Sequence, residues 1–414
     1  MDTGDIQRAI EALPASAEQE IVVWLRNRAQ ARKSARREQK RRARSNTTLR
    51  AALRWTALSL LAFFALQGLL FHSGIYSHNM EPDSSAGFLE GHMTWLAATP
   101  PAARPRIYVI GDSRVAEGFS ARAAVESTDA RYDFWNLGVP GTTPRIWYYM
   151  LRDIVNIRVD TRADTRRAPA AIVVGLDLYS DLDSIEKPQY RVSDLTFLAG
   201  RLKLTDCFDF AASMEDQQRS SQALSGCFLR GLPLRVDIRE FLQSPAGRIR
   251  RARDFGIHGH GYIDGYGGKS EDLTGLSADL PHREIHFGTG AKDWQKESVT
   301  RALLPPAGPQ TGDQTRYRRL WLGRILDLFA GTRTRVFFVE MPRAPLPLPD
   351  ATEPARFLDQ AVARRNVSAL PQDLFHDLER PEVFADGLHL NSRGRAAFSA
   401  RLGQRVAAEL GAGR

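Results

Sequence analysis

The stretch Arg106-Ile-Tyr-Val-Ile-Gly-Asp-Ser113 decides how the rest of the chain is interpreted. Residues 107–110 form a short apolar run rich in β-branched and aromatic side chains, which predicts a buried strand ending at Gly111. Residues 121–125 predict the start of the next helix. Because open α/β sheets bind ligands at the carboxyl ends of their strands, Ser113 is well placed to act as a nucleophile. Gly-Asp-Ser is also a common turn sequence, so the motif alone leaves both interpretations open.

Two further stretches favour the catalytic interpretation. Near the C-terminus, Asp386-Gly-Leu-His389 places a carboxylate three residues before a histidine in a predicted turn. Such a carboxylate can hold the imidazole in one tautomer, which leaves the other ring nitrogen free to take a proton from a serine. The stretch Trp135-Asn-Leu-Gly138 is another predicted strand end, and the Gly138 N–H could approach an oxyanion closely there.

The order Gly-Asp-Ser, Asn-x-Gly and Asp-x-x-His resembles the SGNH (GDSL-type) hydrolase superfamily. The resemblance runs from about Ile107 to the C-terminus, with a divergent middle. It implies an α/β fold, a flavodoxin-like three-layer α/β/α sandwich with a parallel sheet. It also implies that Ser113 is the nucleophile, His389 the base and Asp386 the group that orients the base. The N–H groups of Ser113 and Gly138 would hold the oxyanion.

One position departs from the pattern of this superfamily. After the predicted strand 171–174, the family usually has Gly-x-Asn-Asp, whose asparagine side chain completes the oxyanion hole, but this chain has Gly175-Leu-Asp177-Leu178. An ionised Asp177 would repel an oxyanion. Asp177 must therefore be protonated, turned away or replaced by another donor, and a non-catalytic member of the superfamily stays among the alternatives.

The net charge of +9 is concentrated at the N-terminus, where residues 1–50 hold 12 Lys and Arg against 6 Asp and Glu. Zinc-finger spacing, a helix-turn-helix pattern and interleaved aromatic and basic residues are all missing from the sequence, which argues against a nucleic-acid partner. The basic cluster directly precedes Trp55–Tyr76, 22 residues without Asp, Glu, Lys or Arg. That length suits one transmembrane helix, and cations on its N-terminal side predict a cytoplasmic N-terminus.

These features predict four parts of the chain. Residues 1–50 are expected to form a basic, helical cytoplasmic tail, 51–76 a signal anchor in a bacterial inner membrane, and 77–105 a linker. Residues 106–414 would form the periplasmic SGNH-like domain, with an insert at about 190–315. A buried core helix or a cleaved signal peptide fits the apolar segment less well.

The insert contains Cys207 and Cys227, which predict a disulfide, with two unpaired buried thiols as the alternative. It also contains His258-x-His260 in a glycine- and aromatic-rich loop. Together with His282 and His286 these histidines could form a metal cluster, but their irregular spacing favours a substrate loop that contacts a sugar or a plain surface loop. We expect Arg114, His258, His260 and Arg343 to bind substrate, and no metal or cofactor.

The overall plan is similar to that of proteins that O-acylate envelope or exported polysaccharides, such as the alginate acetylation proteins and the D-alanine transfer protein of teichoic-acid synthesis. That resemblance implies a membrane-bound O-acyltransferase or a polysaccharide synthesis and export complex as partner, and a polysaccharide as substrate. The leading expectation is therefore a membrane-anchored polysaccharide O-acetyltransferase that works through a serine acyl-enzyme. An anchored carbohydrate or lipid esterase and a non-catalytic polysaccharide-binding scaffold subunit are the alternatives.

Overall fold

The computed structural model describes residues 15–99, 103–159, 168–180, 188–258, 266–304, 314–348 and 355–412, together with Gly4 and Gln7. The chain divides into two compact units, Met1–Gly68 and Leu69–Arg414. Besides the strands and helices described below, the described residues form five short elements, which are η2 (Ser77–Asn79), η4 (Pro188–Tyr190), α15 (Arg356–Val362), η5 (Gln372–Leu378) and η6 (Pro381–Val383).

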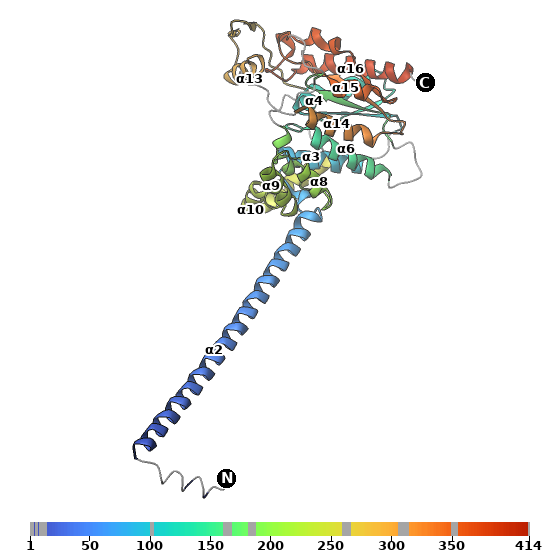
Figure 1. Cartoon of the computed structure of the whole chain (residues 1–414). Coiled ribbons are helices and arrows are strands. Elements are labelled where there is room, and N and C mark those ends of the chain that lie inside the picture. The colour runs from blue at the N-terminus through green and yellow to red at the C-terminus, as the bar shows by residue number, and fades with distance from the viewer. Residues whose placement is uncertain are drawn as a thin grey trace. The chain divides into compact units, whose positions relative to one another are not determined.

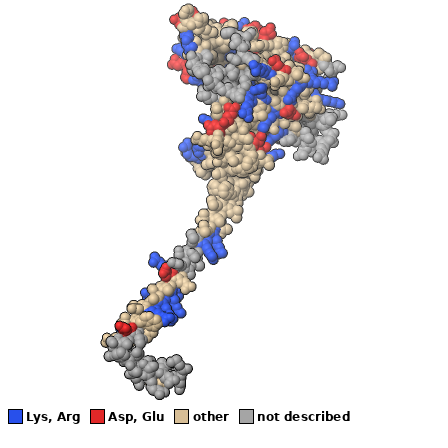
Figure 2. Space-filling model, in the orientation of Figure 1, with Lys and Arg blue, Asp and Glu red and all other residues tan. Residues whose placement is uncertain are grey.

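The first unit consists mainly of helix α2 (Ala15–Gln67), and the π-helical turn η1 (Gly68–His72) continues it. The segment Arg50–His72 is long and apolar enough to cross a membrane, with a mean hydropathy of 1.5. Only 6% of its most apolar stretch is buried, whereas the core helix of a soluble protein is mostly buried. Figure 2 shows the cations on the N-terminal part of α2 and an uncharged stretch after them.

Five parallel strands form the central sheet of the second unit. They are β1 (Arg106–Ile110), β2 (Asp133–Asn136), β3 (Ala171–Leu176), β6 (Arg335–Glu340) and β7 (Val367–Ala369), in the spatial order β2-β1-β3-β6-β7. When the five strands are numbered one to five along the chain, their spatial order is 2-1-3-4-5. This is the order of doubly wound, flavodoxin-like sheets, in which the chain switches direction between β1 and β3. The predicted α/β class with a parallel sheet is confirmed.

Alternate residues of the strands enter two separate hydrophobic cores, as the two-residue period of a strand requires. Tyr108 and Ile110 pack in one core with α3 (Ser85–Ala98), α6 (Pro144–Val159) and α14 (Gln314–Leu328). Ile107 and Val109 pack in the other with α5 (Ala121–Glu126) and α16 (Ser392–Ala412). The sheet is therefore a middle layer between helices on both faces (Figure 1).

Helix α3 lies where the sequence predicts a linker, and that prediction is wrong for these residues. Phe88, Leu89 and Met93 are at most 4% exposed and belong to the same core as the sheet. Gly91 allows a further close contact, because a Cβ at this position would lie 1.6 Å from the Phe255 ring. The segment before β1 is thus an integral layer of the domain.

The insert between β3 and β6 is mostly helical. It contains α7 (Asp194–Leu198), α8 (Asp206–Ala212), α9 (Gln217–Phe228), α10 (Arg235–Gln243), α11 (Pro245–His258), the antiparallel pair β4 (Ser277–Asp279) and β5 (Glu284–His286), and α13 (Asp293–Leu303). Cys207 and Cys227 form a disulfide between α8 and α9, which confirms the predicted pairing.

Candidate active site

The sharp turn after β1 positions Ser113 as the first residue of the short helix α4 (Ser113–Gly118). Asp112 caps this helix, because its side chain accepts a hydrogen bond of 2.9 Å from the Arg114 N–H. Burial raises the pKa of Asp112 above its ordinary value. A Cβ on Gly111 would lie 2.3 Å from a methyl group of Val115, so the turn needs a glycine. Among the described residues, none accepts a hydrogen bond from the Ser113 N–H.

Ser113, His389 and Asp386 form a continuous hydrogen-bonded chain. His389 Nε2 lies 2.9 Å from Ser113 Oγ, and His389 Nδ1 lies 3.0 and 2.9 Å from the two carboxylate oxygens of Asp386. The two ends of this chain come from opposite parts of the sequence, α4 and the turn before α16. The geometry allows Nε2 to take the Ser113 proton while Asp386 holds the opposite side of the ring.

The carboxyl group of Asp386 is held in its charged form. Burial opposes ionisation, but hydrogen bonds from the His389 ring and from the N–H groups of Leu388 and His389 outweigh it and hold the pKa of Asp386 well below its ordinary value. An ionised carboxylate at this place fixes the imidazole orientation and stabilises the imidazolium that forms during proton transfer.

Helix α13 of the insert supports the turn that carries His389. The Gln295 side chain donates a hydrogen bond of 2.8 Å to the Ala385 carbonyl, and Ser298 Oγ accepts one of 3.1 Å from the Gly387 N–H. A Cβ on Gly387 would lie 2.4 Å from the Ser298 carbonyl oxygen, so only glycine permits this approach. The insert therefore contributes to positioning the candidate base His389.

The structure contradicts the predicted oxyanion role of Gly138. Its N–H donates a hydrogen bond of 2.9 Å to Asn136 Oδ1, and a Cβ at Gly138 would lie 2.3 Å from the Ala116 nitrogen. The Asn136 amide nitrogen donates to the carbonyls of Val115, Ala116 and Phe119. Asn-x-Gly thus anchors α4 to the end of β2, and its glycine provides close packing.

Gly141, three residues later, has the features that Gly138 lacks. It is exposed and has a φ of +73°, in the left-handed region that glycine adopts without strain. Within the described part of the chain, no group accepts a hydrogen bond from its N–H. Thr142, the next residue, contacts the turn that precedes the nucleophile candidate through a hydrogen bond from its hydroxyl to the Gly111 carbonyl.

Asp177, also predicted at the oxyanion hole, is engaged in a buried ion pair. Its Oδ1 lies 2.7 Å from Arg318 Nη2, and the two side chains are 7% and 1% exposed. Arg318 comes from α14 and also donates a hydrogen bond to the Ser180 carbonyl. A carboxylate that accepts from an arginine cannot itself donate to an oxyanion, so this part of the prediction is wrong.

The four predicted substrate-binding residues lie in different surroundings, and not all of them are described. Arg343 is 4% exposed and forms a two-pronged ion pair with Glu379, at 2.6 and 2.9 Å, which makes it a structural residue of the loop after β6 rather than a substrate ligand. Arg114, next to the nucleophile, is half-buried and stays a prediction. His258 is the last residue of α11, its side chain lies outside the described residues, and His260 lies outside them altogether.

Two charged groups beside the triad were missed by the sequence analysis. Glu117 Oε1 lies 4.0 Å from His389 Nε2, one helical turn after the nucleophile. Lys269, from the irregular segment before β4, lies 2.9 Å from Glu117 Oε2 and 3.4 Å from Asp386 Oδ2. Burial disfavours its charged form, but the two carboxylates raise the pKa of Lys269. Only the spacing Ser113 to Glu117, which puts both on one helix face, was visible in the sequence.

The assembled groups can perform nucleophilic acyl chemistry. They comprise a hydroxyl bonded to a histidine, a carboxylate that orients the histidine, and the N–H of Ser113 at the start of α4, which donates to no described residue. Lys269 and Glu117, which carry opposite charges, lie beside them. No protein-family model matches the chain, and a search of curated proteins finds no match.

Proposed function

We propose that the chain is a membrane-anchored serine acyltransferase of the SGNH type that transfers acyl groups, most simply acetyl, to a cell-envelope or exported polysaccharide. The observation that carries the proposal is the hydrogen-bonded chain Ser113–His389–Asp386, with an Oγ to Nε2 distance of 2.9 Å. Residues nearly 280 positions apart meet in the order and geometry that a serine nucleophile needs.

In the first half-reaction, Ser113 Oγ attacks the acyl carbonyl while His389 Nε2 takes its proton. The tetrahedral intermediate collapses, the bond to the leaving group breaks, and His389 returns the proton to that group. In the second half-reaction, a sugar hydroxyl gives its proton to His389 and attacks the acyl-serine. Ser113 leaves with that proton, and the product is an ester of the sugar.

The oxyanion of each intermediate needs donors, because charge develops on the carbonyl oxygen. We assign the Ser113 N–H and the Gly141 N–H, neither of which donates to a described residue. The buried ion pair of Asp177 and Arg318 occupies the position where the superfamily usually has an amide donor. Arg318 neutralises the carboxylate, so that it does not repel the intermediate.

A carbohydrate acceptor is supported by an exposed aromatic ring beside the triad. Trp294 of α13 is 42% exposed, and its ring centroid lies 5.8 Å from Lys269 Nζ, the same atom that contacts Asp386. Aromatic faces provide a large contact area for apolar sugar faces at little entropic cost. Arg114 remains a candidate for binding the polar side of the substrate.

The location and partners follow from the anchor and from the resemblance. The segment Arg50–His72 would hold the protein in a bacterial inner membrane with the catalytic unit in the periplasm. A membrane-bound O-acyltransferase would supply the acyl group from the other side of the bilayer. The basic part of α2 would lie on the cytoplasmic side, where it can contact that partner or anionic lipid.

The proposal is tested by deleting the gene in its host and measuring ester-linked acyl groups on the surface polysaccharide. We expect acylation to disappear and to return with the wild-type gene but not with Ser113→Ala. More acylation after deletion would identify an esterase. Unchanged acylation, or rescue by Ser113→Ala, would contradict a catalytic role in acyl transfer and favour a scaffold.

A further inference from the structure

The helices α10 and α11 expose apolar side chains that no element of the described chain covers. Leu232, Val236, Leu242 and Ile249 are 49%, 50%, 69% and 43% exposed. Leu232 lies in the turn before α10, Val236 in its first turn, Leu242 near its end, and Ile249 in α11. We refer to these four side chains as the α10–α11 patch. Several large aliphatic side chains left exposed on two adjoining short helices make this module a candidate site of interaction with a partner or a membrane.

Helix α10 of the patch shares a hydrophobic cluster with the end of the apolar segment. Phe71, the last residue but one of Arg50–His72, stacks edge-on against Tyr76 at 5.2 Å between ring centroids. Tyr76 in turn stacks edge-on against Phe241 of α10 at 5.7 Å. Two ring contacts thus connect the end of the candidate transmembrane segment to α10. The interfacial layer of a bilayer is about 5–8 Å thick on each side, so an α10 connected in this way to the end of a membrane-spanning segment would lie near the headgroups.

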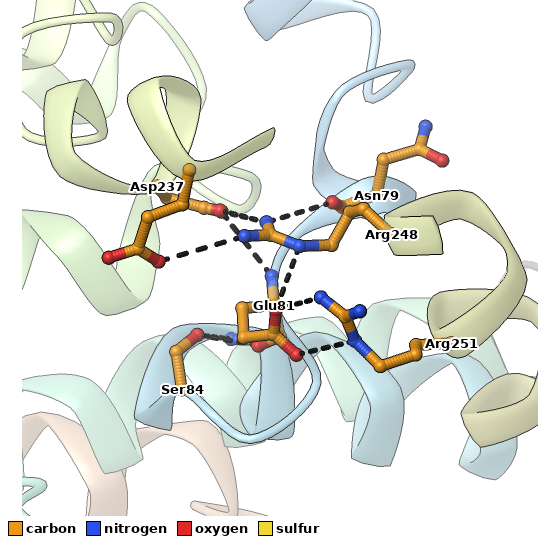
Figure 3. Close-up of polar contacts among 8 residues, drawn as sticks. Asn79, Glu81, Ser84, Asp237, Arg248 and Arg251 are labelled. Carbon is orange, nitrogen blue, oxygen red and sulfur yellow. Dashed lines mark hydrogen bonds and ion pairs between the residues drawn. The ribbon is translucent and has the colours of Figure 1, made fainter. Parts of the chain in front are cut away.

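A cluster of ion pairs around the buried Arg248 fixes this arrangement. Arg248 of α11 is 2% exposed, donates to both carboxylate oxygens of Asp237 at 2.7 Å, and lies 2.9 Å from Glu81 Oε2. Figure 3 shows the cluster joining α10 and α11 to the segment Asn79–Ser84, just after the apolar segment. Because breaking a buried charge pair is costly, the two helices cannot easily move away from that segment.

The end of the apolar segment is also held by hydrogen bonds. Buried Arg230 donates to the Phe71 carbonyl at 3.1 Å, and His72 Nε2 lies 3.1 Å from the Phe228 carbonyl. The Phe71 carbonyl is one of those that a helix end leaves without a partner, and Arg230 satisfies it. The module is therefore attached to the last turn of the segment through both main chain and side chains.

The charges around the patch fit the surface of an anionic bilayer. Arg235, Arg239 and Arg250 are exposed on the same two helices. The nearby acid Asp237 is already bound by Arg248, and Glu240 lies 3.7 Å from the same arginine. Exposed arginines beside exposed aliphatic side chains are the composition of helices that lie in a membrane interface.

We infer that the α10–α11 patch rests in the headgroup layer of the membrane, so that the catalytic unit is attached to the bilayer by a second contact besides its anchor. This inference rests on the proposed membrane insertion of Arg50–His72. It does not depend on the acyl chemistry. A fixed contact of this kind limits the rotation of the catalytic unit about its anchor and holds the active site at one orientation to the bilayer.

The test uses the full chain with single introduced cysteines, since both native cysteines are bonded to each other. Leu242→Cys reports on the patch, Leu61→Cys on the apolar segment, and Val362→Cys, exposed on α15, is the matched control. Each variant is labelled with an environment-sensitive fluorophore and reconstituted in vesicles of phosphatidylcholine and phosphatidylglycerol, with or without nitroxide-labelled lipid. We expect strong quenching at 61, a comparable loss at 242 and little loss at 362.

Quenching at 61 with none at 242 would overturn the inference and leave the anchor intact. If quenching were missing at 61 as well, the anchor itself would be wrong and the inference would fall with it. Disulfide cross-linking of unlabelled Leu242→Cys between two chains, without lipid quenching, would assign the patch to a second copy instead.

Reversing the charge of two exposed arginines, Arg235→Glu with Arg239→Glu, should reduce quenching at 242 and not at 61. An unchanged signal at 242 would contradict the role of the anionic headgroups.

Discussion

The carboxyl ends of β1 and β3 are neighbours in the sheet, and each carries a polar side chain of a kind that active sites use. Ser113, after β1, is half-buried, and its hydroxyl faces a histidine that can accept a proton. Asp177, after β3, is 8% exposed and paired with a buried arginine. The same location thus carries a candidate nucleophile at one strand and a structural ion pair at the next, and the partner of each side chain makes the difference.

The largest expected effect is on the reactive side of this comparison. His389→Ala removes the group that takes the Ser113 proton, and we expect the rate of acyl-enzyme formation to fall on the order of 10⁶-fold. The free energy of unfolding should fall by only about 1 kcal/mol. The burst of product from an activated ester measures the rate, and His286→Ala, at an exposed hairpin position, is the control. A full burst from His389→Ala would remove the distinction between the two strand ends.

On the structural side, Asp177→Ala should lower stability rather than reactivity. It leaves the Arg318 guanidinium buried without its carboxylate, and such a break costs about 3–5 kcal/mol. Chemical denaturation measures the loss, and the burst per folded molecule should stay near that of the wild type. The double change Asp177→Leu with Arg318→Met should recover most of the stability. A stable Asp177→Ala protein without a burst would place Asp177 in the catalytic machinery.

The pH dependence of stability distinguishes the carboxylate of the triad. The folded-state pKa of Asp386 is depressed, so its contribution is present above the ordinary pKa of about 3.9 and is lost as the pH falls. We expect the wild type to be about 2 kcal/mol more stable than Asp386→Asn at neutral pH. Denaturation at a series of pH values should show this gap closing below about pH 4. A gap that does not vary with pH would mean that Asp386 acts only through its shape.

The smallest expected effect concerns the acceptor. Trp294→Ala removes the exposed ring beside Lys269, and loss of a stacking contact worth roughly 1 kcal/mol should raise the KM for an oligosaccharide acceptor about five-fold. Formation of the acyl-enzyme should not change, because the ring does not contact the triad residues. The control is Leu320→Ala, a partly exposed site on α14. Equal KM values in the Trp294→Ala and wild-type proteins would remove the support for a sugar at this ring.

The parts of the site that sequence reasoning predicted are carried by local patterns. Gly-Asp-Ser and Asp-x-x-His each fix a turn within a few residues, so Ser113, Asp386 and His389 could be identified without knowing the fold. The buried strands β1 and β3 were equally visible, because parallel strands covered on both faces consist of continuous apolar runs, whereas the short edge strand β7 was not predicted. The disulfide followed from two cysteines close together in the insert.

The parts that were missed depend on residues far apart in the sequence. The partner of Asp177 lies 141 residues away on α14, and Lys269 reaches Glu117 from the insert. Arg343 looked available because it follows a strand, but its partner Glu379 comes from beyond β7. The occupied Gly138 amide had a local signal, since an asparagine side chain often accepts from the N–H two residues later.

The most direct test of the central claim is the mass of the protein after treatment with a serine-directed fluorophosphonate. We predict a single adduct on the peptide that contains Ser113, none on Ser113→Ala, and an unchanged adduct on Ser221→Ala, which alters an exposed serine of α9. Circular dichroism and an unchanged unfolding midpoint would show that the unlabelled variant is folded. An adduct on folded Ser113→Ala, equal to that of the wild type, would contradict the assignment of Ser113 as the nucleophile.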